Sequence, residues 1–410
     1  MPAERASDMS DRTSQLHRIS AVPCSETTYE QQSIALCMTV YLMTFSAGCY
    51  AVFLGSFLSR KGLNQEIAGI VGAVASAALM GGNLFWGFLS DRLGKRRPLI
   101  VLGCLVAAPC LILWLWSDTW WQYAALSAVG QFFFVACSTL LFVMVLDLLP
   151  ATSRSQRFGT FRLWGSAGLI TASWGVGWFL PASPERVFVF AGVALFVAVV
   201  PLVLATREKF HPRPDRFHFA HVLRSPQLLV FYACTLLHGI WEPACFLFLS
   251  YSLTQQQAGE GMIGIILGLN GVVGMISLPL AGRMADRWGR QPLLVAMYFI
   301  SAVRMLLYSF VSTPLGLIPV QLLQFGSFGI AEAVGSVYVS ELADERDRAT
   351  AITCFYMAHS TGALVGSAAG GFISSHFGFA FMYQMFSAVM VVTGLLFLRA
   401  GTKRIQILSK

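Results

Sequence analysis

Five ionisable residues lie inside long apolar stretches of this chain. They are Asp147, Arg162, Glu242, Arg304 and Glu332. A charge in the hydrocarbon of a bilayer costs at least about 2.5 to 3.5 kcal/mol, so such residues usually face a bundle interior or a watery cavity. A deep carboxylate needs a cationic partner or a proton. Glu242 and Glu332 could therefore carry protons, and Arg162 could bind a polar or anionic group.

Two histidines accompany these residues. His238 lies four residues before Glu242, a spacing that places both on one face of a helix, where they could share a proton. His359 is a further titratable residue in an apolar stretch. Each of these residues also has a structural interpretation, because Asp147 and Arg162 could pair at helix ends and a membrane histidine is often a packing residue.

The composition indicates a membrane protein. Hydrophobic residues make up 56% of the 410 residues and charged residues only 12%, against about a quarter charged in a soluble domain. Apolar runs of about 20 residues, long enough to cross a bilayer, fill the chain. Twelve spans are predicted, at approximately 33–58, 66–90, 98–117, 121–148, 159–180, 186–206, 226–252, 261–281, 292–312, 315–341, 350–373 and 379–398.

The basic residues predict the orientation. With both termini inside, nearly all of the 28 Lys and Arg residues fall in inside loops, and only Arg60, Lys61 and Arg186 fall outside. Residues 1–32 are polar and carry no signal peptide pattern. We therefore expect a multi-pass protein of the cell (inner or plasma) membrane with both termini in the cytoplasm. Topology explains the net charge of +8, so nucleic acid is not expected as a partner.

No pattern in the sequence predicts a cofactor. The nine cysteines are scattered without a Cys-x-x-Cys pair, so neither a disulfide framework nor a metal site is predicted. The polar segments contain no nucleophile and base motif, metal-ligand spacing or phosphate loop. An enzyme is not expected.

The chain contains an internal repeat. Gly-Phe-Leu-Ser-Asp-Arg-Leu-Gly at 87–94 returns as Gly-Arg-Met-Ala-Asp-Arg-Trp-Gly at 282–289, which is 195 positions later. One long polar break separates two sets of six spans. The predicted units are an N-terminal tail (1–32), a six-helix bundle (33–206), a central loop (207–225), a second bundle (226–398) and a C-terminal tail (399–410).

Glycines are concentrated in the second, fifth, eighth and eleventh predicted spans. Small residues spaced four apart let helix backbones approach closely in lipid, where no hydrophobic force drives helices together. These four spans are predicted to form the seam between the bundles.

The repeated turn resembles the signature loop of the major facilitator superfamily. The resemblance covers the whole chain and implies an all-α membrane protein with twelve transmembrane helices in two pseudo-symmetric six-helix bundles. It also implies a monomer that moves a solute by alternating access. Glycines in the turn would permit close approach and a tight turn, and its aspartates would bond a neighbouring helix N-terminus. The predicted cytoplasmic gate comprises Gly87, Asp91, Arg92, Gly94, Gly282, Asp286, Arg287 and Gly289.

A second motif resembles the branch of this superfamily that contains lactose permease, nucleoside permeases and phenylpropionate permeases. Residues 157–168 read Arg-Phe-Gly-Thr-Phe-Arg-Leu-Trp-Gly-Ser-Ala-Gly. In that branch Arg162 matches a sugar-binding arginine and Arg304 an arginine near the proton site. Gln324 and Ser327 replace a histidine and the proton-carrying glutamate, so that particular proton site is absent. The predicted substrate-binding residues are Arg162, Trp164, Gln324 and Tyr41, and the predicted proton-coupling residues are Glu242, Glu332, Arg304, His238 and Asp147.

These patterns predict a secondary active transporter that carries a small polar or organic-anion solute by proton-coupled symport. Solute, protons and the lipid bilayer are then its partners. Drug or metabolite efflux by proton antiport is the alternative, but the fifth span lacks the mid-helix Gly-Pro typical of such exporters. A receptor or scaffold that has lost transport is a third possibility.

Overall fold

The computed structural model describes residues 26–148, 154–179, 185–205, 222, 224–344 and 347–408. These residues are almost entirely helical, and they contain no strand. The helices of the N-terminal half are α2 (Glu26–Arg60), α3 (Gln65–Leu93), α4 (Arg97–Ile112), η1 (Leu113–Trp116), α5 (Trp120–Leu148), α6 (Arg154–Ile170), η3 (Thr171–Val176), α7 (Gly177–Phe179) and α8 (Glu185–Ala205). Those of the C-terminal half are α10 (Pro226–Gln255), α11 (Glu260–Trp288), α12 (Arg290–Phe310), α13 (Pro314–Gln321), η4 (Phe325–Gly329), α14 (Ile330–Leu342) and α15 (Arg348–Leu408).

Ten helical stretches in the described part of the chain are long and apolar enough to cross a membrane. One of them, Thr350–Ala400, joins two predicted spans, because α15 has a non-helical backbone only at Gly378 (φ 83°, ψ 165°). The predicted fifth span corresponds to the continuous run of α6, η3 and α7. This run is too polar to be counted among the ten apolar stretches. Each of the twelve predicted spans thus has a helical counterpart, and the chain is an integral multi-pass membrane protein.

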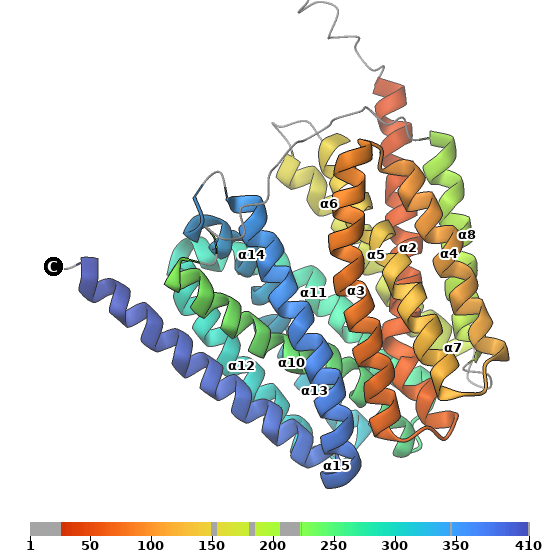
Figure 1. Ribbon diagram of the computed structural model, residues 1–410. Helices are drawn as coiled ribbons and strands as arrows, with labels where there is room; N and C mark the ends of the chain where they lie inside the picture. The colour runs from red at the N-terminus through yellow and green to blue at the C-terminus, as the bar shows by residue number, and fades with distance from the viewer. Residues whose placement is uncertain are drawn as a thin grey trace, which may run out of the picture.

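The helices form two bundles, one from each half of the chain. Figure 1 shows α2, α3, α4, α5 and α8 on one side and α10, α12, α14 and α15 on the other. The bundles converge at the lower end of the view, where α2 ends and α3 begins, and diverge at the upper end. We call the lower end the closed face and the upper end the open face.

The glycine-rich helices pack across the junction as predicted. A Cβ atom at Gly264 in α11 would lie 2.0 Å from the carbonyl oxygen of Ser173 in η3. A Cβ atom at Gly69 in α3 would lie 2.5 Å from the carbonyl oxygen of Ser367 in α15. No side chain larger than hydrogen fits at these distances. The seam prediction is therefore confirmed, with the second span against the eleventh and the fifth against the eighth.

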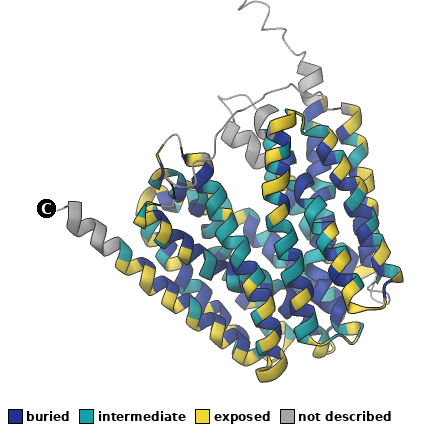
Figure 2. Ribbon diagram, viewed as in Figure 1, coloured by how far each residue is buried: buried dark blue, intermediate teal, exposed yellow. Residues whose placement is uncertain are grey.

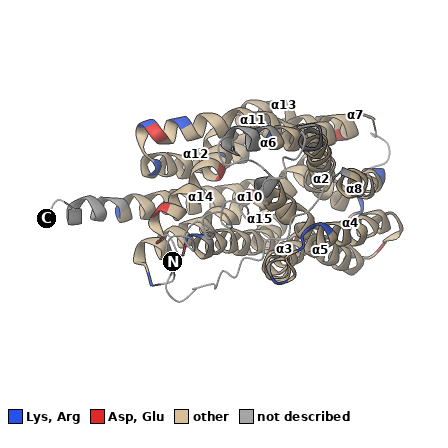
Figure 3. Ribbon diagram, turned by 90° about the horizontal axis from the view of Figure 1, so that it is seen from above, with Lys and Arg blue, Asp and Glu red and all other residues tan. Residues whose placement is uncertain are grey.

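The surface of the bundles is the part that faces lipid. Exposed residues follow the outer sides of the helices, and buried residues follow the sides that face other helices (Figure 2). Charged residues occupy few positions when the molecule is viewed from the open face, and a basic stretch lies where α3 passes into α4 (Figure 3). The basic residues between the end of α3 and the start of α4 are Lys95, Arg96 and Arg97.

Some helix ends differ from the prediction. The first helix begins at Glu26, inside the predicted tail, and α15 continues to Leu408, beyond the predicted end of the last span. Hydropathy locates the apolar part of a helix and not a polar extension into water. The predicted tenth span is divided into α13, η4 and α14, with a π-helical turn at Phe325–Gly329. Most of the predicted N-terminal tail and central loop lies outside the described residues.

We expect Gly264→Ala to destabilise the protein and Gly274→Ala to leave its stability unchanged. Both glycines lie in α11, but a Cβ atom at Gly274 would have no other atom within 4 Å. Overpacking at Gly264 should cost about 1 to 3 kcal/mol. The unfolding midpoint in detergent, followed by reaction of the buried cysteines with a thiol dye, measures this difference. Equal midpoints for the two variants would contradict the close contact.

Candidate functional site

A cavity of about 440 Å³ lies between the two bundles. This volume is within the range of small-molecule sites. Its wall is mostly apolar and receives side chains from both halves. The polar residues of the wall are Ser46, Tyr50, Ser76, Ser127 and Gln131 from the N-terminal half and Glu242, Glu332, His359 and Ser367 from the C-terminal half. A solute in this cavity would contact both bundles at once.

An ion pair joins the two halves through Glu332, which lines this cavity, and Arg162, which does not. Nη2 of Arg162 in α6 donates to Oε2 of Glu332 in α14 at 3.5 Å. Both side chains are partly exposed, at 40% for Arg162 and 32% for Glu332. Glu332 follows the π-helical turn η4 directly, within the interrupted tenth span. The pair is long and open to water, so a solute anion could compete with Glu332 for Arg162.

Tyr41 and Trp164 contact each other in the N-terminal half. Their rings meet edge to face, with centroids 6.2 Å apart, and the Tyr41 hydroxyl is 2.9 Å from Oγ1 of Thr171. Trp164 is 44% exposed. The structure thus brings Tyr41 to Trp164, two residues from Arg162 in the sequence, although neither ring lines the central cavity.

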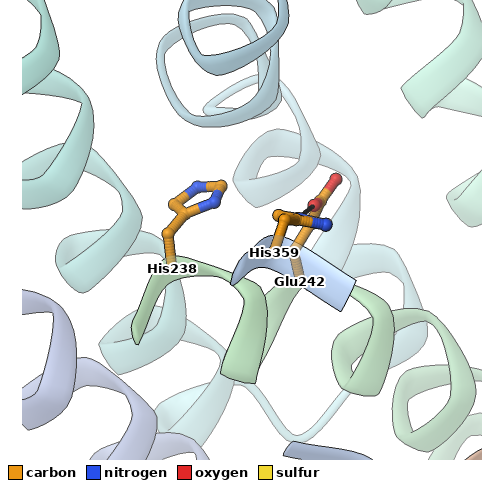
Figure 4. Close-up of side chains that lie close together, drawn as sticks. All are labelled: His238, Glu242 and His359. Carbon is orange, nitrogen blue, oxygen red and sulfur yellow. Dashed lines mark hydrogen bonds and ion pairs between the residues drawn. The ribbon is translucent and has the colours of Figure 1, made fainter. Parts of the chain in front are cut away.

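Glu242 pairs with a residue that was not among the predicted site residues. Oε2 of Glu242 in α10 lies 2.8 Å from Nε2 of His359 in α15. His238, one turn earlier in α10, is buried beside them (Figure 4). Both Glu242 and His359 line the central cavity.

Glycines hold α10 and α15 close enough for this arrangement. A Cβ atom at Gly239 would lie 2.2 Å from the carbonyl oxygen of His359, and one at Gly362 would lie 2.1 Å from that of Leu236. Gly239 and Gly362 therefore set the distance between the two helices. Gly239 lies between His238 and Glu242 in the sequence and packs directly against the backbone of His359. The three side chains are therefore brought close together.

Arg304 is the centre of a separate buried cluster. Its Nε donates to the Tyr308 hydroxyl at 3.0 Å, and its Nη2 donates to Oε1 of Gln321 at 2.6 Å. Nη1 donates to Gln324 and, at 3.1 Å, to Oγ of Ser327. Arg304 is 2% exposed, and these partners are all neutral. The guanidinium charge is stabilised by these hydrogen bonds and by cation–π contacts with the rings of Trp241 and Tyr308.

Among the predicted substrate-binding and proton-coupling residues whose side chains the structure describes, only Glu242 and Glu332 line the central cavity. Gln324, predicted to bind substrate, is 2% exposed and contacts Arg304. Arg304 itself shares only a small secondary cavity with Glu242. The roles predicted for Arg304, Glu242 and His238 in proton coupling stay predictions. Asp147 stays one too, and its side chain lies outside the described part of the structure.

A second ion pair fastens the closed face. Nε of Arg60, at the end of α2, lies 2.7 Å from Oε1 of Glu260, at the start of α11, and the Ser56 hydroxyl donates to the same oxygen at 2.7 Å. Glu260 is 1% exposed. By contrast, Lys61 and Glu185, 2.7 Å apart on this face, both belong to the N-terminal half, and their hydrogen bond raises the pKa of Lys61. The Arg60 pair therefore links the bundles.

The residues of the predicted gate lie on the open face. Gly94 and Gly289 adopt positive φ angles of 61° and 83°, as expected for tight turns. Close helix approach at Gly87 and Gly282 stays a prediction for a conformation closed at this end, because in the present one a Cβ atom at either would have no neighbouring atom within 4 Å. The bundles are apart at this end. The side chains of Arg92, Asp286 and Arg287 are exposed there, and that of Asp91 lies outside the described residues.

Sequence reasoning did not include His359, Glu260 or Arg60 among the site residues. His359 had a sequence signal, a titratable residue inside an apolar span. Arg60 and Glu260 had none, because both were placed in outer loops where charges are ordinary. Only the approach of α2 to α11 gives them a shared function.

Two helical bundles around a central cavity, joined by ion pairs between the halves, are an arrangement expected of a membrane transporter. The sequence model of the MFS_1 like family matches residues 34–385. The chain therefore belongs to this family of the major facilitator superfamily.

Known proteins of similar sequence and structure are transporters. The chain is 27% identical over 364 residues to the multidrug resistance protein MdtG of Enterobacter lignolyticus, a match that covers 83% of each. It is 22% identical over 376 residues to a cis,cis-muconate transport protein of Acinetobacter baylyi, which covers 84% of this chain and 87% of that protein. The fold is similar to that of a mutant of the nucleoside transporter NupG, with a TM-score of 0.82 at 14% identity over 90% of this chain and 99% of the other.

We expect Glu260→Gln to loosen the closed face. The substitution removes the ion pair with Arg60, which should be worth about 1 kcal/mol because Arg60 is partly exposed. Spin labels at Glu66 and Gln256, in a background without native cysteines, should report longer distances between the halves. Glu185→Gln is the matched control, because its partner Lys61 lies in the same half. Identical distance distributions in both variants and the wild type would exclude an inter-bundle role for Glu260.

Proposed function

We propose that the protein is a secondary active transporter that moves a small organic anion across the cell membrane together with a proton. The observation that carries this proposal is the ion pair between Arg162 and Glu332, one residue from each bundle, of which Glu332 lines the central cavity. A group that binds anions and a group that binds protons are in contact there. Each can therefore change what the other binds.

The proposed coupling follows from competition for Arg162. When Glu332 is ionised, its Oε2 pairs with Nη2 of Arg162, 3.5 Å away, and so competes with a solute anion for the guanidinium group. When Glu332 binds a proton, its negative charge is lost and Arg162 becomes available to a solute carboxylate. Proton binding therefore favours solute binding. By linkage, bound solute favours the protonated carboxyl group to the same extent.

The surroundings of Glu332 supply few other charges. Arg162 reaches it from α6, and Glu242, His359 and Tyr356 line a small cavity beside it from α10 and α15. Glu242 already bonds to His359. Arg162 is thus the cation with which Glu332 pairs directly. This pairing supports the assignment of Glu332 as the proton carrier.

In the proposed alternating access, the closed face would open and the open face would close. The present conformation has tight glycine contacts and the Arg60 to Glu260 pair at one face and separated bundles at the other. In the reverse conformation the Arg60 pair would break, and the turns at 87–94 and 282–289 would come together. We propose that the open face is the cytoplasmic one, with both termini on that side, and that the protein acts as a monomer. The distribution of basic residues supports this orientation.

The names of the relatives support two substrate classes. The muconate transport protein is consistent with an organic anion that an arginine recognises. The similarity to MdtG favours a second candidate function, the export of drugs or metabolites by proton antiport. In antiport, the solute and the proton would compete for the site, so solute binding would release a proton instead of favouring its uptake.

We expect Arg162→Lys to weaken solute binding at least about tenfold, because an ammonium group cannot bind a carboxylate with two parallel hydrogen bonds. Panels of aromatic acids, dicarboxylates, sugars, nucleosides and dipeptides should first be screened for thermal stabilisation of the purified protein. Arg283→Lys, at an exposed position in α11, is the control. Wild-type affinity in Arg162→Lys would exclude the binding role.

We expect Glu332→Gln to transport without proton coupling. A neutral amide mimics the protonated carboxyl group, so solute exchange across liposomes should persist while solute-driven proton movement is lost. For the wild type, solute uptake should rise when the proton gradient drives protons in the same direction as the solute. A fall in uptake under this gradient would favour antiport. If the wild type moves solute at one rate with or without a pH gradient, the coupling is refuted.

A further inference from the structure

Two histidines and a carboxylate converge in the wall of the central cavity. The ligand atoms of His238, Glu242 and His359 all lie within 4.8 Å of one another. Figure 4 shows the three side chains together, with His238 and Glu242 from one helix and His359 from the other. We propose that these residues form a binding site for a divalent transition-metal cation of the Zn²⁺ class.

The donor set matches this class of cation. Two imidazole nitrogens and one carboxylate oxygen are a known Zn²⁺ ligand set, which leaves a fourth position for water or another ligand. Ligand atoms at about 2.0 to 2.1 Å from Zn²⁺ lie roughly 3.4 Å apart in a tetrahedron. Glu242 and His359 are closer than this, at 2.8 Å, because they share a hydrogen bond. Small side-chain rotations would place all three around one ion.

His238 supplies the second, independent observation. Its side chain is only 4% exposed, and its Nε2 atom has no hydrogen-bond partner among the described residues. A buried polar atom without a partner is unusual in a folded protein. The rings of Trp241 and Tyr298 lie beside His238, with centroids 5.3 and 6.2 Å from its own. A cation bound to His238 through Nε2 would give this atom its partner.

The site has room for an ion and a route to it. A small cavity of about 40 Å³ is lined by all three ligands and by Glu332, and one water-sized sphere needs only about 10 to 15 Å³. Glu242 and His359 also line the central cavity, so an ion could enter from it. All three ligands belong to α10 and α15 in one bundle, so rocking of the bundles would leave the site intact.

The test is direct metal binding by the purified full-length protein, prepared with an affinity tag that contains no histidine. We expect one Zn²⁺ per chain in competition with a chromogenic chelator. Co²⁺ at the same site should give visible absorption bands of a low-coordinate nitrogen and oxygen environment. No retained Zn²⁺ and no Co²⁺ bands in the wild type would overturn the proposal, whatever the variants do.

Variants locate the site. His238→Ala, His359→Ala and Glu242→Gln should each weaken Zn²⁺ binding at least tenfold. His376→Ala, at an exposed position in the same helix as His359, should bind as the wild type does. Unchanged binding in Glu242→Gln, or equal loss in His376→Ala, would overturn the assignment. Glu242→Gln keeps the shape of the side chain, so it decides the question if either cluster histidine proves necessary for folding. Because the assay uses neither solute nor a pH gradient, its outcome is independent of the proposed symport.

Discussion

The close approach of helix backbones at glycines is the constraint on which this structure depends. Lipid gives no hydrophobic reason for helices to associate, so packing distance decides which side chains can meet. At the junction of the bundles, Gly69 and Gly264 each face a carbonyl oxygen of the opposite half. Within the C-terminal half, Gly239 and Gly362 do the same between α10 and α15 and place His359 against Glu242. The same device therefore builds both the seam and the site.

The charged residues between the helices differ in burial and in the number of their hydrogen bonds. Arg304 has hydrogen bonds for all three of its nitrogen atoms within one bundle and is almost fully buried, which suits a permanent structural centre. Arg162 has a long bond to Glu332 across the bundles, and its side chain is partly exposed. An interaction across a moving junction must be weak enough to break. This difference in burial and bonding is consistent with a structural role for Arg304 and with the role proposed for Arg162.

The closed face shows how the two kinds of contact act together. Backbone contacts at glycines act only at short range and are lost when the bundles separate. If Arg60 and Glu260 part, by contrast, a buried carboxylate is left without its cation. Water entering the face would solvate that carboxylate. In the proposed alternating access, opening of this face would change the packing, the ion pair and the solvation of Glu260 together.

The sequence by itself determined the class of fold and the residues worth attention. Apolar length and the segregation of basic residues follow from bilayer thickness and from charge, which act locally, so the spans, the repeat and the glycine-rich seam could be predicted. Arg162, Glu242 and Glu332 could be found because a deep charge is rare. Their partners could not be found, because partner choice depends on contacts between helices far apart in the chain. Only the tertiary structure assigned His359 to Glu242, Gln324 to Arg304 and Arg60 to Glu260, since helix rotation and separation decide which polar groups meet.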